Sequence, residues 1–497
     1  MTRNWPKRMT LLITLLMTGG YLFAQQIEWG EKNKAKSKNY QPIILMDDGE
    51  SIYTTYFDAH HADIERHSIK GVLVYSTSIE LGKIGNNYPE IEYVGYLNDK
   101  FVLFASYYNA SNDTATLYSY SYCGKTGIQT GEETKLFAVP AVKNWSRGNF
   151  TFIPSQDQSK IMINTTVTKG NSGKITDCFK LFDSNMNMLM ERDEIVYGKE
   201  VDYTNQNFTV DSGGSIYFVR KKSEGQFFMV EYDAAKKWAK WEEVIDASKT
   251  DKNLSVTGVA FGFDSNLDLI ITGICTATHK GITKPVGAMY MKVDRLSKDV
   301  KIFKTYTFDT FRKMGGFSFT NPSMHFTKGN NLVFISECQS EMQYKNSTMY
   351  MEGDLALASF ATEGELLWSN SIQKIQIYSN AAVIPFTVAM SNAQYFSYVS
   401  GISGNNLFVF FNNNPMNLTR QDGEKGPSVM PFSKTIPMLN TINLTDGKIV
   451  YKQFFDPKEA NTYLKIRGSY PMSNSSDIIA LAQYKGIYQF VRIKLEE

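Results

Sequence analysis

Two adjacent histidines, His60 and His61, are followed closely by Asp63 and Glu65, and no other histidine among the five in the chain has such a cluster of ligand types around it. Imidazole and carboxylate groups are the ligands that zinc takes at fixed spacings. Neighbouring residues of an extended chain point in opposite directions, so the two imidazoles cannot easily face one ion. We therefore interpret the cluster as a solvated polar loop and predict no metal site.

The segment 264–268 places oxygen-bearing side chains at alternate positions, as the start of a calcium-binding loop does. The glycine and the distal glutamate of an EF-hand loop are missing. Asp or Asn at the start of a turn bonds the backbone two residues further on, which explains the same pattern. We interpret the segment as a turn, with a calcium loop as the alternative, and predict no cofactor.

The chain lacks the short motifs of common catalytic sites. It contains no Gly-x-Ser-x-Gly, no His-Glu-x-x-His and no Gly-x-x-x-x-Gly-Lys-Ser/Thr segment. A glycosidase needs only two carboxylates about 5–10 Å apart. The 50 acidic residues supply such pairs in any number, so sequence assigns no catalytic residue.

Four aromatic residues fall outside the alternating pattern of the strands: Trp145, Tyr344, Tyr350 and Phe432. The segments 339–353 and 412–434 are predicted to be long loops, and loops of this length in a compact domain are often functional. Large aromatic side chains with a polar edge are typical of binding surfaces. We therefore take these four as candidate binding residues and assign most other Tyr and Phe residues to the core.

The four cysteines are far apart and include no Cys-x-x-Cys pair: Cys123, Cys178, Cys275 and Cys338. Each falls on or beside a predicted strand in a different unit. We interpret them as small buried core residues. One or two disulfides remain the alternative for an exported chain.

Residues 1–24 have the pattern of a secretory signal peptide. Arg3, Lys7 and Arg8 precede an apolar run over 9–17, and Ala24 offers a small residue for cleavage before Gln25. No later segment approaches the roughly 20 apolar residues of a spanning helix. We expect an exported chain, periplasmic or at the cell surface, with no transmembrane segment after cleavage.

A short hairpin unit recurs along the chain. In each copy a turn rich in Asp, Asn, Gly or Ser leads into an apolar strand, and the copies begin at 51, 100, 160, 215, 268, 331, 406 and 477. Starts roughly 50–75 residues apart are the loose period of a propeller or array. A second hairpin in most units gives four strands per unit, the complement of one blade.

These strands predict an all-β fold and a single β-propeller over 25–497. The expected blades are 40–90, 90–140, 147–195, 205–247, 255–308, 320–375, 395–455, and 460–497 closed by 25–35. The last unit shows three strands, and 26–29 is a candidate for the missing one. Such closure removes an open sheet edge. We favour eight blades, with seven if the weak first unit is not a blade.

The hairpin over 358–368 resembles the repeat of quinoprotein-like (PQQ-type) propellers. Ala358, Gly364 and Trp368 match the first, seventh and eleventh positions of that repeat, and Phe360 replaces its Asp. The segment 441–451 is a weaker copy. The resemblance implies the fold and suits eight blades, but no residues match a quinone pocket. The Asn/Tyr/Lys-rich composition and the Phe-Ala-Gln-Gln junction at 23–26 also resemble secreted propellers of Bacteroidetes-type bacteria.

The formal net charge of +2, with acids and bases interspersed, lacks the basic surface of a nucleic-acid-binding protein. Loops on one face of a rigid ring suit recognition of an envelope protein or polysaccharide. Because every specific catalytic motif is missing, the sequence favours a non-catalytic binding or scaffold protein of the cell envelope. The alternative is a carbohydrate-active enzyme, a polysaccharide lyase or glycoside hydrolase, with carboxylates and a Tyr, Arg or His converging in the propeller funnel.

Overall fold

The computed structural model describes residues 27–36, 40–84, 88–141, 149–169, 174–198, 201–223, 225–312, 318–344, 347–381, 394–418, 434–473 and 475–495. The predicted signal peptide and the candidates Trp145 and Phe432 lie outside these residues. Within the described ranges, no helix has the length and apolar character needed to cross a membrane.

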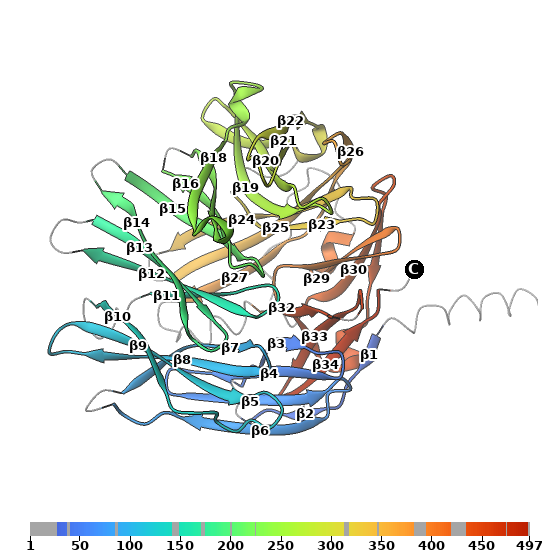
Figure 1. The fold of residues 1–497 in the computed structure, drawn as a ribbon. Coiled ribbons are helices and arrows are strands. Elements are labelled where there is room, and N and C mark those ends of the chain that lie inside the picture. The colour runs from blue at the N-terminus through green and yellow to red at the C-terminus, as the bar shows by residue number, and fades with distance from the viewer. Residues whose placement is uncertain are drawn as a thin grey trace, which may run out of the picture.

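The described chain is nearly all β, as predicted, and its strands form antiparallel sheets, most of them four-stranded (Figure 1). The N-terminal half comprises β3 (Ile43–Asp47), β4 (Ser51–Phe57), β5 (His61–Ser68) and β6 (Leu73–Glu80); β7 (Pro89–Leu97), β8 (Lys100–Asn109), β9 (Thr114–Cys123) and β10 (Thr134–Pro140); and one continuous sheet of β11 (Phe150–Pro154), β12 (Lys160–Lys169), β13 (Lys174–Asp183), β14 (Met188–Gly198), β15 (Val201–Val210), β16 (Ile216–Lys222), β17 (Phe227–Asp233) and β18 (Ala239–Ile245).

The C-terminal half continues the same pattern. Its sheets are β19 (Leu254–Phe263), β20 (Leu269–His279), β21 (Ile282–Val293) and β22 (Val300–Thr307); β23 (Ser318–Phe326), β24 (Leu332–Tyr344), β25 (Ser347–Phe360), β26 (Leu366–Ile372) and β27 (Gln376–Ala381); β28 (Val399–Ser403), β29 (Asn406–Asn413), β30 (Ile436–Asn443) and β31 (Ile449–Gln453); and β32 (Tyr463–Pro471), β33 (Ile478–Tyr484) and β34 (Ile487–Ile493), joined by β1 (Ile27–Trp29) and β2 (Asn33–Lys34). The described helices are single turns, α2 (Asp309–Arg312), α4 (Pro457–Ala460), η3 (Ala234–Lys236), η4 (Ala247–Lys249) and η5 (Pro415–Leu418).

Side chains of the turns fix where these strands begin. Asp264 Oδ1 accepts hydrogen bonds from the backbone N–H groups of Asn266 and Asp268 at 2.9 and 3.0 Å, and its Oδ2 lies 3.2 Å from Lys292 Nζ. The carboxylate of the candidate calcium segment is therefore committed to a turn and a lysine. Asp211 closes the equivalent turn before β16 by accepting from Ser215 N at 2.8 Å.

The core lies between neighbouring sheets, where the apolar faces of consecutive sheets meet. One cluster joins Tyr217 and Met229 to Ile271 and Met289 on the following sheet, and another joins Ile335 and Leu357 to residues of β29 and β30. Alternating strand positions therefore face one neighbour or the other, and both faces of most sheets are buried.

The first strands of consecutive sheets lie next to one another. Contacts join β3 to β7, β7 to β11, β11 to β15, β19 to β23, β23 to β28, β28 to β32, and β32 back to β3. Between β15 and β19, Asn207 Nδ2 donates to Val259 O at 2.7 Å. Since β32 and β3 come from opposite ends of the chain, the last sheet lies against the first (Figure 1).

The N-terminal strand pairs with the last strand of the chain. Residues 27, 28 and 29 are antiparallel partners of 493, 492 and 491, so β1 forms the edge of the sheet β34-β33-β32. Glu28 also lies 2.6 Å from Lys494, and Trp29 packs edge-on against Phe455 at a centroid distance of 5.2 Å.

One predicted loop is not a loop. Residues 339–344 lie on β24 and residues 347–353 on β25, and these two strands pair with each other while β27 pairs with β25. This extension of the two strands projects beyond the apolar core, so most of its residues are polar or charged and show little alternation of apolar and polar side chains. The sequence pattern therefore did not predict strands here. Of the second predicted loop, 412–413 end β29 and 415–418 form η5, and the residues from 419 to 433 lie outside the described part of the chain.

Candidate binding site

The predicted loop aromatics do not form the site that the described residues display. Tyr344 ends β24, and Tyr350 lies on β25 opposite Glu341 and Tyr378, so both belong to strands rather than to a loop. Tyr350 is partly buried. Trp145 and Phe432 lie outside the described residues, so all four stay predictions as ligand-binding groups.

The cluster around His61 is also different from the predicted solvated loop. Asp63 and Glu65 lie on β5 and are only 1% exposed, because this strand is covered by the segment around Lys36 and Tyr40 and by β34. Lys36 Nζ lies 2.6 Å from Asp63 Oδ1, and Tyr488 OH donates to Glu65 Oε2 at 3.0 Å. Against the effect of burial, hydrogen bonds from His67 and Tyr40 hold the pKa of Glu65 at about 2.

The cluster around Glu65 is a contact between the first and last sheets, and its partners come from the chain itself. In the ranges that the structure describes, no group of three or more His, Cys, Asp or Glu side chains is arranged to hold a metal ion. Cys178, Cys275 and Cys338 are buried, as the core interpretation predicts, whereas Cys123 at the end of β9 is only partly buried. Burial raises the pKa of Cys275 to about 12.

A register comparison points to a different location. In most sheets the first strand carries a β-bulge, and the last residue before this bulge pairs with a residue of the second strand. In five sheets that second-strand residue is apolar or uncharged: Thr54, Ala105, Val219, Ile274 and Leu481. In the β23–β24 pair this residue is Glu337, which pairs with Thr320 and is fully buried. A buried carboxylate is costly unless it is paired, so this exception requires an explanation.

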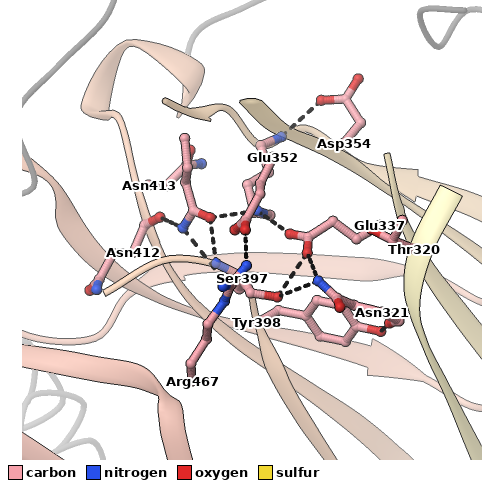
Figure 2. A network of polar contacts seen from close by, with 12 residues as sticks. Thr320, Asn321, Glu337, Glu352, Asp354, Ser397, Tyr398, Asn412, Asn413 and Arg467 are labelled. Atoms are coloured by element: carbon pink, nitrogen blue, oxygen red, sulfur yellow. Dashed lines mark hydrogen bonds and ion pairs between the residues drawn. The ribbon is translucent and has the colours of Figure 1, made fainter. Parts of the chain in front are cut away.

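Glu337 is held by three side chains from other segments (Figure 2). Lys374 Nζ lies 2.5 Å from its Oε1, and both side chains are fully buried. Ser397 Oγ and Asn321 Nδ2 each donate to Oε2 at 2.8 Å. The charge on Glu337 is therefore balanced by an ammonium and shared with two neutral donors.

A second buried carboxylate, Glu352 on β25, lies beside the first (Figure 2). It forms an ion pair with the guanidinium of Arg467, which comes from the bulge of β32. Burial, and then repulsion from Glu337, raise the pKa of Glu352 to about 7, although Lys374 and Arg467 act in the opposite direction. Two acids and two bases thus face one another inside the protein.

Gln376 ties this cluster to the neighbouring sheet. Its Oε1 accepts from Lys374 Nζ at 2.6 Å and from Ser397 N at 2.7 Å, and its Nε2 donates to Asn412 O at 2.6 Å. Ser397 has φ +70°, a region in which non-glycine residues are uncommon, and the surrounding hydrogen bonds hold its backbone. The φ of +45° at Asn321 belongs to the bulge of β23, because Asn207 has φ +56° in the bulge of β15.

A recess of about 380 Å³ opens over the cluster. It is lined by Asn321, Ser397, Tyr398, Val399, Ile466, Arg467 and Ser469, from β23, from the turn and start of β28, and from β32. The Arg467 side chain is 33% exposed, whereas its partner Glu352 is 0% exposed. Arg467 is therefore the charged group that connects the recess to the buried acids.

The sequence analysis did not identify any of these residues. No sequence motif relates the positions of these residues, which are 321, 337, 352, 374, 397 and 467. Glu337 also lies in a strand whose other residues before it are typical of a buried core strand. The one available signal was a charged residue after an apolar run, Phe334-Ile335-Ser336-Glu337, at a position that is apolar or uncharged in the other bulged sheets.

No protein-family model matches the chain, and no curated protein matches its sequence. Among the solved structures that resemble it, the polysaccharide lyase Uly1 has 12% sequence identity and a TM-score of 0.38, and the match covers 80% of this chain and 88% of the lyase. Prolyl oligopeptidase B from Galerina marginata has 9% identity and a TM-score of 0.40, with 94% of this chain and 57% of the peptidase covered. The WD40 domain of SCAP from fission yeast has 9% identity and a TM-score of 0.38, with 95% of this chain and 98% of that domain covered. The chain thus spans less than two thirds of the peptidase. With TM-scores below 0.5, these likenesses say nothing about what this chain binds or whether it is an enzyme.

Proposed function

We propose that the chain is a closed eight-bladed β-propeller in which β1 completes the last blade. The pairing of β1 with β34 supports this, as do the contacts of each first strand with the next and of β32 with β3. The continuous sheet β11–β18 is then two blades joined through β14 and β15, where only two residue pairs connect them.

A recurring aromatic–glycine contact supports kinship with quinoprotein-like repeats. Trp368 Nε1 donates to Leu444 O at 2.8 Å, and a Cβ on Gly447 of that turn would lie 2.7 Å from the Trp368 ring. Between the first two sheets, a Cβ on Gly127 would lie 2.6 Å from the ring of Tyr75, which lies on the fourth strand of its sheet, as Trp368 does. The glycine and the aromatic of the repeat therefore meet across adjacent sheets, which is a packing role rather than a cofactor site.

We further propose that the chain is an exported binding protein of the cell envelope that takes part of a polysaccharide or envelope protein into the recess at Arg467. The observation that carries this is the buried pairing of Glu337 with Lys374 and of Glu352 with Arg467 beneath an open recess. Buried charges contribute little net stability, so a role in recognition accounts for the burial of these two pairs.

A polysaccharide array tests this proposal. Wild-type protein should bind one class of polysaccharide, and Arg467→Ala should lose that binding. Arg295→Ala is the matched control, because Arg295 is also 33% exposed and ion-paired, to Asp211 at 3.0 Å, but lies outside the recess. Retention of binding by Arg467→Ala, or equal loss in both variants, contradicts the proposed site.

One observation favours the enzyme as a second candidate. Glu352, whose pKa is raised to about 7, lies near Tyr398 and Arg467, which is the convergence expected of a lyase or hydrolase funnel. Incubation of each bound polysaccharide with the protein distinguishes the two functions. Shortened or unsaturated chains that disappear with Glu352→Gln would establish the enzyme, and intact chains support the binding protein.

A further inference from the structure

Among the described residues that line the recess, one side chain is charged, and it is already paired. Arg467 is shared between the recess, where it is one-third exposed, and the buried Glu352. A guanidinium binds a carboxylate through two parallel N–H···O bonds. Val399 and Ile466 add apolar surface beside it, which suits the carbon skeleton of a small acid.

The charge balance of the cluster limits what can enter. Glu352 faces Glu337 from β24, Lys374 from the segment after β26, and Arg467 from β32. The partly buried Asp354 accepts from the backbone N–H of Lys374 at 2.9 Å, so the two bases have no charge to spare when the acids are ionised. A ligand carboxylate would add a further negative charge. In a site of low dielectric such an excess is costly, and the acid that ionises least readily is the one that takes up a proton.

We infer that the recess takes a ligand with a carboxylate group, and that Arg467 binds this group in place of Glu352, which takes up one proton from solvent as the ligand enters. This inference rests on the proposed function, because it names the ligand chemistry of the same recess. The carboxylate could belong to an acidic sugar or to the end of a peptide. The volume of about 380 Å³ admits a single sugar or amino-acid unit.

The proton uptake gives the binding a defined pH dependence. Above the pKa of Glu352, which is about 7, ligand entry must be accompanied by protonation, so affinity falls as the pH rises. Below pH 6, Glu352 is already protonated and affinity is constant. For one proton the affinity should fall about fivefold from pH 7 to 8, and the slope approaches about tenfold per pH unit above pH 8.

Titration calorimetry with glucuronate, N-acetylglycine and glucose at pH 6, 7 and 8 tests the inference. At least one of the two acids should bind and glucose should not, and which acid binds distinguishes the sugar from the peptide. Buffers of different ionisation enthalpy should reveal uptake of close to one proton at pH 8. Glu352→Gln should bind at pH 8 as tightly as at pH 6, Arg467→Gln should not bind, and Arg295→Gln should match the wild type.

Three results would overturn the inference: no binding of either acid, equal binding of glucose and glucuronate, or an affinity that is constant from pH 6 to 8 and unaffected by Glu352→Gln. These results do not decide the proposed function, which the polysaccharide array judges separately. One combined result separates the two proposals: Arg467→Ala loses binding on the array, but the affinity of the wild type for the acids does not change with pH. This result would support the recess as the binding site and would contradict the replacement of Glu352 by the ligand carboxylate at Arg467.

Discussion

Arg467 on β32 forms an ion pair with Glu352 on β25, 115 residues earlier in the chain. This contact joins two sheets that are separated in sequence by the whole of β28–β31. It also connects a recess at the surface to a carboxylate that solvent does not reach.

Glu352→Gln should change how stability depends on pH. The pKa of Glu352 is about 7 in the folded protein and about 4.3 in an unfolded chain, so the folded state binds more protons between these values. The free energy of unfolding therefore falls as the pH rises from about 4.5 to 7, by about 3 kcal/mol from this group, and does not fall further above pH 7. Urea denaturation across this range should show that Gln removes the decline.

The control for this experiment is Glu132→Gln, at an exposed glutamate in a turn, which should follow the wild-type curve. Parallel curves for wild type and Glu352→Gln would show that Glu352 titrates normally.

Lys374→Met should destabilise the protein by about 3–5 kcal/mol, because it leaves the buried charge of Glu337 without its partner. Replacing both members, in Glu337→Gln/Lys374→Met, should recover much of this loss. Lys249→Met removes an exposed lysine 3.9 Å from Glu243 and should have a much smaller effect. A double-mutant cycle by chemical denaturation measures the coupling, and additive effects of the two single changes would contradict it.

Lys465→Met should stabilise the protein at neutral pH. Lys465 is 1% exposed, and among the described residues no acceptor bonds its Nζ. Burial lowers its pKa to about 7, so between pH 7 and 10.5 the unfolded chain binds more protons and wild-type stability rises with pH. The gain from Met, as much as about 5 kcal/mol near pH 7, should shrink over this range.

Lys458→Met, at an exposed residue of α4, is the control for the lysine experiment and should not change the pH profile. If Lys465→Met is less stable than the wild type at every pH, the ammonium has a favourable partner and the assignment is wrong.

Gly447→Ala should weaken the contact between adjacent sheets. Gly447 has φ +71°, and a Cβ there would lie 2.7 Å from the Trp368 ring. Backbone strain of roughly 1 kcal/mol and overpacking of about 1–3 kcal/mol should add. Gly225→Ala, at φ +90° with nothing within 4 Å, carries the backbone cost alone. Thermal denaturation should rank the two variants, and equal losses would mean that the ring moves aside freely.

The closure of the ring can be tested with paired cysteines at Trp29 and Val491. These residues are antiparallel partners on β1 and β34, and partner Cα atoms lie about 4.5–5.5 Å apart, within the range that a disulfide spans. Oxidation of Trp29→Cys/Val491→Cys should give a crosslinked pair of peptides after digestion. Trp29→Cys/Tyr197→Cys, with the second cysteine exposed on β14, should not crosslink. Crosslinking in neither pair would contradict the closing strand.

Local sequence signals were sufficient to predict the individual turns and strands of the fold. Asp264 and Asp211 specify turns through their own side chains, and a continuous apolar run such as Leu269-Ile270-Ile271 specifies a strand buried on both faces. These are short-range effects, so eight hairpin copies were visible without coordinates. The pattern failed at 339–353, where a hairpin extends past the core and apolar alternation, its only marker, is lost.

Only the tertiary structure decided where charge is buried. Glu337 was hidden in an apolar strand, and the burial of Asp63 and Glu65 depends on segments around Tyr40 and Tyr488 that are hundreds of residues apart. The two buried carboxylates are bound by Lys374, Arg467 and Ser397. These residues are far from the carboxylates in sequence, and no motif relates their positions. The physical reason is that turn chemistry and strand periodicity act over a few residues, whereas desolvation and ion pairing depend on which sheets lie side by side.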